Sequence, residues 1–215
     1  MTEDVLTRFR IHFHKTSELR YIGHLDLHRS LERALRRANL PLDYSRGFNP
    51  RVKLNLSTAL PLGCSSTTEL ADFWLQSELQ EEQVLQALQA VVPPGLLVIS
   101  IEKIDPKLPS LQSSINAISY HVKFLQDVDQ VQLAGKIHEV IVAEQLIRLR
   151  RGKQYDLRPL IQALKLVQQP PDPPVLRMVL LAGEGKTGRP EEVLLELGLD
   201  PAETLIERTQ LFLTE

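Results

Sequence analysis

The order of short apolar segments constrains the fold of this chain more than any other feature of its sequence. In the first half, apolar residues that alternate with polar ones predict strands, and apolar residues three or four positions apart predict helices. These segments follow one another in the order β-α-β-β-α-β. The expected strands are residues 6–14, 52–56, 69–75 and 96–104, and the expected helices are residues 24–38 and 81–92.

The second half repeats this order without visible sequence identity. Two successive units of this kind predict an α+β protein made of two tandem ferredoxin-like (βαββαβ) units with antiparallel sheets. Residues 1–104 form the first expected unit and residues 115–215 the second, joined by a Pro- and Ser-containing linker at 105–114. The second unit has expected strands at 117–125, 145–150, 175–181 and 207–213, helices at 131–143 and 189–197, and a strand followed by a short helix within 156–169.

Composition excludes several classes of protein. With 43% hydrophobic residues, the chain can form a packed core. Its single cysteine, Cys64, excludes an internal disulfide framework, a self-contained four-cysteine zinc site and an iron–sulfur cluster held by three cysteines. No segment approaches the length of a membrane span, and the first residues lack the pattern of a secretory signal. We therefore expect a cytoplasmic protein with no membrane partner.

Charge is segregated along the chain although the formal net charge is only −2. Residues 1–56 carry 11 basic and 6 acidic side chains, whereas residues 57–103 carry 1 basic and 6 acidic side chains. Arg outnumbers Lys by 16 to 9. Because guanidinium groups bind phosphate bidentately and stack on bases, this bias favours a local surface for an anionic partner.

The first basic segment combines a helix and the loop that follows it. The helix places four arginines at positions i, i+4, i+7 and i+8, with Glu32 near enough to neutralise part of this row. The loop adds cations beside aromatic rings, the combination that binds single-stranded nucleic acid. The alternative is a solvated helix face and a tight loop whose Tyr44 and Phe48 belong to the core. The predicted nucleic-acid-binding residues are Arg29, Arg33, Arg36, Arg37, Tyr44, Arg46, Phe48, Asn49, Arg51 and Lys53.

A second basic segment lies in the second half, and decoration of helices with Arg–Glu pairs explains it equally well. Its residues are Arg148, Arg150, Arg151, Lys153 and Arg158.

Histidines and carboxylates raise two further possibilities. His24 and His28 lie one helical turn apart, and His12 and His14 share a strand face, but no third ligand is well placed, so we expect no metal site. His24 and Asp26 are the candidates for general acid–base chemistry on RNA. They carry the alternative of an RNA-processing endoribonuclease.

Three sequence segments resemble the radical-SAM-linked protein family, a bacterial domain family of unassigned function. They are residues 21–29 (YIGHLDLHR), 31–42 (LERALRRANLPL) and 44–51 (YSRGFNPR), with further similarity at 60–63 (LPLG), 66–72 (STTELAD), 156–159 (DLRP) and 189–193 (RPEEV). Gly23 stands where the family pattern often has Ser. The similarity is strongest over residues 8–75.

The resemblance implies a domain found fused to, or encoded beside, a cobalamin-binding radical-SAM enzyme, with links to RNA metabolism. The iron–sulfur cluster, S-adenosylmethionine and cobalamin would then belong to the partner and no cofactor to this chain. Transferred by position, the implied functional surface is His24, Asp26, Arg29, Arg33, Arg36, Arg37, Tyr44, Ser45, Gly47, Phe48, Asn49, Pro50 and Arg51.

We therefore expect a non-catalytic, RNA-directed domain, of the tRNA or rRNA class, that holds substrate for a radical-SAM enzyme. Two alternatives remain, the endoribonuclease and a protein–protein adaptor whose arginines bind an acidic partner.

Overall fold

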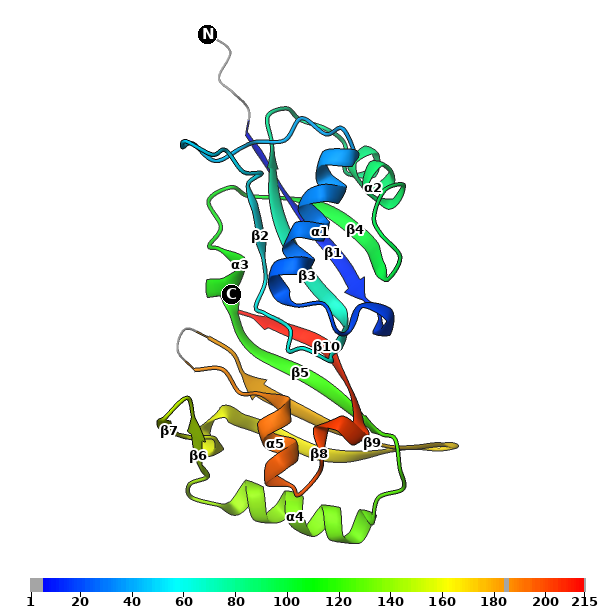
Figure 1. Cartoon of the computed structure of the whole chain (residues 1–215), viewed down its shortest axis with the longest axis vertical. Helices are drawn as coiled ribbons and strands as arrows, with labels where there is room; N and C mark the ends of the chain where they lie inside the picture. Colours follow the sequence, from blue (N-terminus) through cyan, green and yellow to red (C-terminus); the bar gives the residue numbers. More distant parts are fainter. Residues whose placement is uncertain (1–5, 184–185, 215) are drawn as a thin grey trace. The chain divides into compact units, whose positions relative to one another are not determined.

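The computed structural model describes residues 6–183 and 186–214 and divides into two compact units, Met1–Ser114 and Ile115–Glu215 (Figure 1). Each unit combines an antiparallel sheet with a few helices, which confirms the predicted α+β class. Within the described ranges, no helix has the length and apolar character needed to cross a membrane.

The sheet of the first unit has the strand order β4-β1-β3-β2. Each pair of neighbouring strands is antiparallel. The strands and helices lie close to their predicted positions in the sequence. Their bounds are β1 (Thr7–Lys15), α1 (His24–Arg37), β2 (Leu54–Leu56), β3 (Ser65–Leu75), α2 (Glu81–Gln89), β4 (Leu96–Ile104) and α3 (Leu111–Ser114), with a short 3-10 helix, η1 (Ser17–Leu19).

The core of the first unit lies between one face of this sheet and the helices α1 and α2 (Figure 1). Alternation along β1 turns Phe9, Ile11 and Phe13 to this face, where all three are buried. The α1 helix contributes its apolar stripe, and α2 contributes Val84 and Leu88. Burial of this stripe orients α1, so that its arginine-bearing side remains exposed.

Local interactions fix both ends of α1. The buried Lys15 ammonium donates to the backbone oxygens of Arg20, Ile22 and Cys64, at 3.2–3.3 Å, and so ties the loop before the helix to the end of β1. Gly23 is the N-cap residue and offers no side-chain cap. At the other end Asn39 adopts a positive φ of 52°, a conformation that Asn tolerates and that terminates helices.

The opposite face of β1 carries two buried arginines. Arg8 and Arg10 both bind the fully buried carboxylate of Asp72 on β3, with nitrogen–oxygen distances of 2.5–3.1 Å. Arg8 also donates to the carbonyl oxygens of Leu108 and Pro109. Part of the predicted linker, residues 105–114, therefore packs against the first unit, which extends to Ser114.

The second unit has the strand order β10-β5-β9-β8, again with antiparallel neighbours. The helix α4 packs against β8, with Asp129 capping its first turn through the backbone N–H groups of Val131 and Gln132. The elements are β5 (Ile115–Phe124), α4 (Gln130–Val142), β6 (Ile147–Arg150), β7 (Lys153–Asp156), β8 (Ile161–Gln169), β9 (Asp172–Leu181), α5 (Pro190–Glu196) and β10 (Thr204–Leu213), with short 3-10 helices η2 (Arg158–Leu160) and η3 (Pro201–Glu203).

Two details of this unit differ from the predictions. Residues 145–150 do not supply a strand of the main sheet, because β6 pairs with β7 in a separate two-stranded hairpin. The strand next to β9 is β8, and the 3-10 helix η2 precedes it instead of following it. The turn at Arg151 and Gly152, both with positive φ, allows a tight hairpin that propensity alone did not reveal.

Candidate nucleic-acid interface

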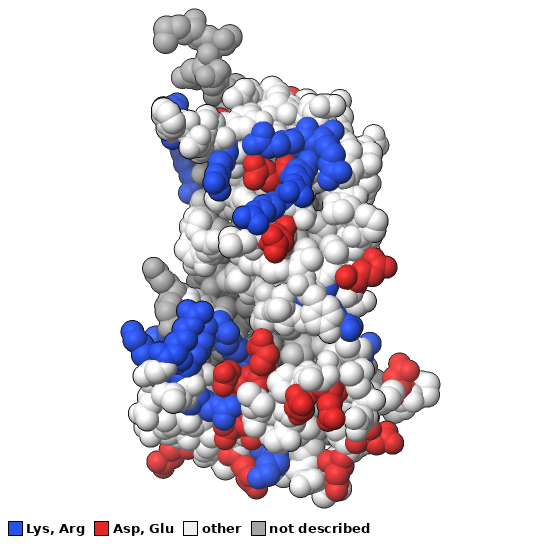
Figure 2. All heavy atoms as spheres, in the orientation of Figure 1, with Lys and Arg blue, Asp and Glu red and all other residues white. Residues whose placement is uncertain are grey.

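The exposed side of α1 carries the four predicted arginines, and Figure 2 shows basic side chains gathered over this helix. Two of them have carboxylate partners. Arg29 lies 3.2 Å from Asp26, and Arg36 lies 2.9 Å from Glu32. Arg33 and Arg37 are exposed and have no carboxylate partner within residues 6–183 and 186–214. These two guanidinium groups are therefore available to an external anion.

Arg36 joins α1 to the loop that follows it. Its guanidinium lies over the ring of Tyr44, 5.3 Å from the ring centre, and Tyr44 packs against the core. The hydrogen bond to Glu32 raises the pKa of Arg36, with a further contribution from Tyr44. Arg36 and Tyr44 thus contact each other within the fold. Arg36 is also paired with Glu32 and Tyr44 packs against the core, so both are less available to bind a ligand.

Residues 45–51 form a loop that is closed at its base. The backbone N–H of Ser45 donates to the carbonyl of Arg51, and the N–H of Arg51 donates to the Ser45 hydroxyl, at 2.8 and 3.0 Å. Phe48 at the tip is 102% exposed. The alternative that both aromatics belong to the core is therefore wrong for Phe48, although Tyr44 does pack against the core. Arg46, Asn49 and Arg51 are exposed beside Phe48.

Lys53, the last predicted binding residue, forms an ion pair with Asp43. Burial acts to raise the pKa of Asp43, but the hydrogen bond and charge of Lys53, with smaller contributions from Tyr44 and Gln76, lower it below its usual value. The Lys53 charge is thereby neutralised locally. We call the remaining cations, Arg33, Arg37, Arg46 and Arg51, the arginine surface.

The candidate catalytic pair lies on the first turn of α1. The Asp26 carboxylate binds Arg29, while the Asp26 carbonyl accepts the hydroxyl of Ser30 at 2.8 Å. His28, the neighbour of His24 on the helix, contacts the carbonyl of Leu54 at 3.2 Å through its Nε2. Among the described residues, no group of three or more His, Cys, Asp or Glu side chains is arranged to hold a metal ion. Cys64 is buried.

The second basic segment separates into two kinds of residue. Arg148 binds Glu192 and Glu196 of α5 at 3.1 and 3.2 Å, and Arg158 donates to the carbonyls of Ile141 and Ile161. Arg148 thus joins the β6–β7 hairpin to α5, and Arg158 joins η2 to α4 and to the start of β8. The remaining cations, which we call the hairpin tip, lie in or next to the turn and have no carboxylate partner in the described part of the chain; they are Arg150, Arg151 and Lys153.

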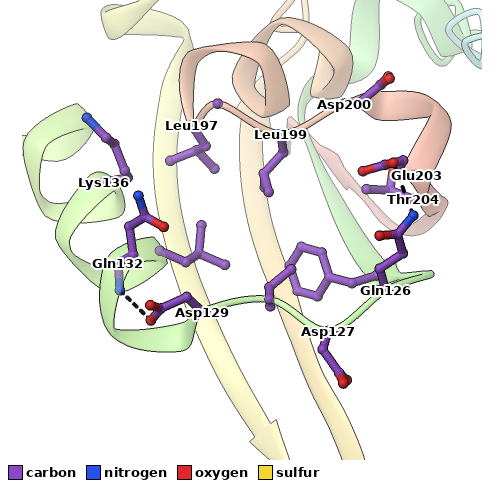
Figure 3. A pocket seen from close by; sticks show the side chains of 14 residues that line it. Gln126, Asp127, Asp129, Gln132, Lys136, Leu197, Leu199, Asp200, Glu203 and Thr204 are labelled. Carbon is purple, nitrogen blue, oxygen red and sulfur yellow. Dashed lines mark hydrogen bonds between the residues drawn. The ribbon is translucent and has the colours of Figure 1, made fainter.

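The second unit also contains a pocket of about 350 Å³, shown in Figure 3. Asp129, Gln132 and Lys136 line one side, and the segment from Leu197 to Thr204 lines the other. Its polar groups have local partners. Asp129 caps α4, Asp200 accepts from the backbone of Ala202, and Gln126 donates to Glu203 at 3.1 Å. These contacts account for Gln126, Asp129, Asp200 and Glu203 without a ligand.

Comparison with known families assigns the chain. The family described as "Uncharacterized protein conserved in bacteria (DUF2344)" matches residues 8–190. The chain belongs to this family. The matched range covers α1, the 45–51 loop and the β6–β7 hairpin, so both basic clusters lie within the family domain. Comparison with curated proteins finds no sequence match.

Three solved complexes contain a chain that matches this one. A chain of a Cbf5–Nop10–Gar1 complex matches 94% of this chain with 10% identity and a TM-score of 0.50. Chains from an archaeal box H/ACA Nop10–Cbf5 complex and from an H/ACA complex with a substrate RNA both match with a TM-score of 0.46, at 11% and 12% identity, over 95% and 94% of this chain. The chain spans about half the length of these chains, 47–48%. The match to the Cbf5–Nop10–Gar1 chain, at 10% identity, shows a similarity of fold alone.

Sequence reasoning correctly expected Glu32 to neutralise part of the arginine row, through Arg36, but missed how the other cations are paired. The Arg29–Asp26 pair was readable from the i, i+3 spacing. By contrast, Lys53–Asp43 and Arg148–Glu192 join residues on different elements, so only the folded chain reveals them.

Proposed function

We propose that this protein binds RNA through the arginine surface, as a non-catalytic substrate-binding domain. The observation that carries the proposal is that Arg33, Arg37, Arg46 and Arg51 are exposed without carboxylate partners in the described residues, next to others that are neutralised. Guanidinium groups of this kind suit phosphate oxygens, which they bind bidentately. The contact of Arg36 with the Tyr44 ring joins the loop to α1, and the hydrogen bond from Ser45 to Arg51 closes the loop. These interactions favour a preformed arrangement of the cations.

The test uses charge reversal of two residues with a matched control. Arg33→Glu combined with Arg37→Glu is expected to weaken binding of a fluorescently labelled RNA stem-loop about tenfold, measured by anisotropy at moderate salt, because two phosphate contacts are lost and repulsion is introduced. Both side chains are exposed, so the thermal unfolding curve is expected to stay unchanged.

The control makes the same change in net charge elsewhere. Lys107→Glu combined with Lys165→Glu replaces two exposed cations outside both basic clusters and is expected to leave the affinity for RNA within about twofold of the original. Equal losses in the two double variants would assign the effect to net charge and not to the arginine surface. If the unaltered protein does not bind RNA, the proposed function is wrong.

We further propose that the protein acts with a radical-SAM enzyme that carries an iron–sulfur cluster, S-adenosylmethionine and cobalamin. The support is the sequence resemblance at 21–29, 31–42 and 44–51, together with the single Cys64, which cannot supply three cluster ligands. A tagged form of the protein is expected to recover such an enzyme from a nuclease-treated bacterial lysate, identified by mass spectrometry. A direct partnership would be contradicted if an untreated lysate yielded only RNA-binding proteins and these were lost after nuclease treatment.

Two structural proposals accompany this function. The strand orders β4-β1-β3-β2 and β10-β5-β9-β8 support a tandem ferredoxin-like arrangement, in which the β6–β7 hairpin is an insertion into the second unit. The cations of the hairpin tip have no carboxylate partner among the described residues, like those of the arginine surface, which supports a second contact with phosphate.

A further inference from the structure

We infer that the arginine surface takes RNA that contains an unpaired nucleotide, whose base stacks on the ring of Phe48. This inference rests on the proposed function, because it specifies which kind of RNA the same surface recognises. It depends on the exposure of Phe48, the state of the other aromatic rings and the cations around the loop.

Phe48 is presented to solvent by a loop with a defined shape. An exposure of 102% leaves both faces of its ring uncovered. The loop is closed below the ring by the two hydrogen bonds between Ser45 and Arg51 and by the bridge between Tyr44 and Val52. A closed base limits the conformations of the loop, so that less ordering entropy is lost when a base stacks on the ring.

The other exposed or half-exposed rings of the first unit are already covered on one face. Arg20 lies 4.9 Å from the centre of the Tyr21 ring, Arg36 lies 5.3 Å from that of Tyr44, and Arg8 lies 5.3 Å from that of Trp74. A base on these faces would have to displace a guanidinium. Phe48 is therefore the ring in the described first unit that best accepts a base without rearrangement.

The surroundings of Phe48 favour a nucleotide over an apolar ligand. Arg46 and Arg51 are exposed on either side of Phe48 in the sequence, where they can neutralise the phosphates that flank a stacked base. The exposed side-chain amide of Asn49 offers both a donor and an acceptor to a base edge. Paired bases in a regular duplex are stacked on each other and offer no free face, so Phe48 would gain nothing from a duplex.

The experiment compares two forms of one RNA. A stem-loop with 2-aminopurine in its loop is titrated with the protein, and so is the same strand annealed to its full complement. We expect the stem-loop to bind at least about fivefold more tightly than the duplex, with quenching of the 2-aminopurine fluorescence as its base stacks. Phe48→Ala is expected to remove this preference and the quenching, whereas Phe48→Tyr retains both.

Tyr21→Ala serves as the matched control, because it removes another exposed aromatic ring whose face Arg20 already covers. We expect it to leave the preference for the stem-loop unchanged. Equal affinity for stem-loop and duplex, or an unchanged preference in Phe48→Ala, would overturn this inference. The proposed function would still stand if RNA binding depended on Arg33 and Arg37. Absence of binding to both RNAs would instead overturn the proposed function, and this inference with it.

Discussion

Asp72→Ala is expected to lower the free energy of unfolding by about 3–5 kcal/mol, because it leaves two buried guanidinium groups without their shared counter-charge. Asp72 is fully buried, and both of its carboxylate oxygens accept hydrogen bonds from Arg8 or Arg10. Arg8 and Arg10 are themselves only 3% and 9% exposed, so water cannot replace the lost carboxylate without local rearrangement. Chemical denaturation followed by circular dichroism measures the change.

Two further variants provide a comparison for the loss of unfolding free energy in Asp72→Ala. Asp26→Ala removes a carboxylate from an ion pair at the surface, with Arg29, and is expected to cost at most about 1 kcal/mol. Arg10→Met leaves Asp72 paired with Arg8 and is expected to cost less than Asp72→Ala. A loss of under about 1 kcal/mol for Asp72→Ala itself would show that the two arginines are solvated in some other way, contrary to their burial and to the contacts of Arg8 with Leu108 and Pro109.

The same cluster shows where sequence reasoning succeeds and where it stops. Alternation along residues 6–14 correctly predicted β1 and the apolar face formed by Phe9, Ile11 and Phe13. It could not show that Arg8 and Arg10 on the polar face are buried as well. Residues 105–114 have a linker composition, and their contact with Arg8 comes from backbone carbonyls, which carry no side-chain signal in the sequence.

The α1 helix was the most predictable element, because its buried stripe and its arginine row both follow from a period of 3.6 residues. The β6–β7 hairpin was the least predictable. Its strands have four residues each, and Ile147 and Leu149 are exposed, so they give no amphipathic pattern against a core. The hairpin is held by the contact of Arg148 with α5, which lies more than 40 residues further along the chain.

Ion pairs with carboxylates decide which cations can bind an external ligand. The candidate site therefore has fewer cations than the sequence predicted. Arg29 and Arg36 satisfy their charge within α1, and Lys53 satisfies its charge with Asp43. The exposed cations that remain on the arginine surface number four in the described chain, and this number sets an expectation for how binding responds to salt.

Affinity for single-stranded RNA is expected to fall steeply with salt, because each phosphate contact releases condensed counterions. Four contacts at about 0.7 each predict a slope of about −3 for the logarithm of the binding constant against the logarithm of salt concentration, or about a 50-fold loss between about 50 and 200 mM salt. In the Arg33→Glu, Arg37→Glu variant, the two remaining contacts predict a slope of about −1.4 and a loss of about sevenfold. Anisotropy titrations at several salt concentrations measure both slopes. Equal slopes for the two proteins would mean that Arg33 and Arg37 do not contact phosphate. A slope steeper than about −4 in the unaltered protein would require further cations in contact with phosphate. Reversing the charge of Arg151 would then test whether the hairpin tip supplies them.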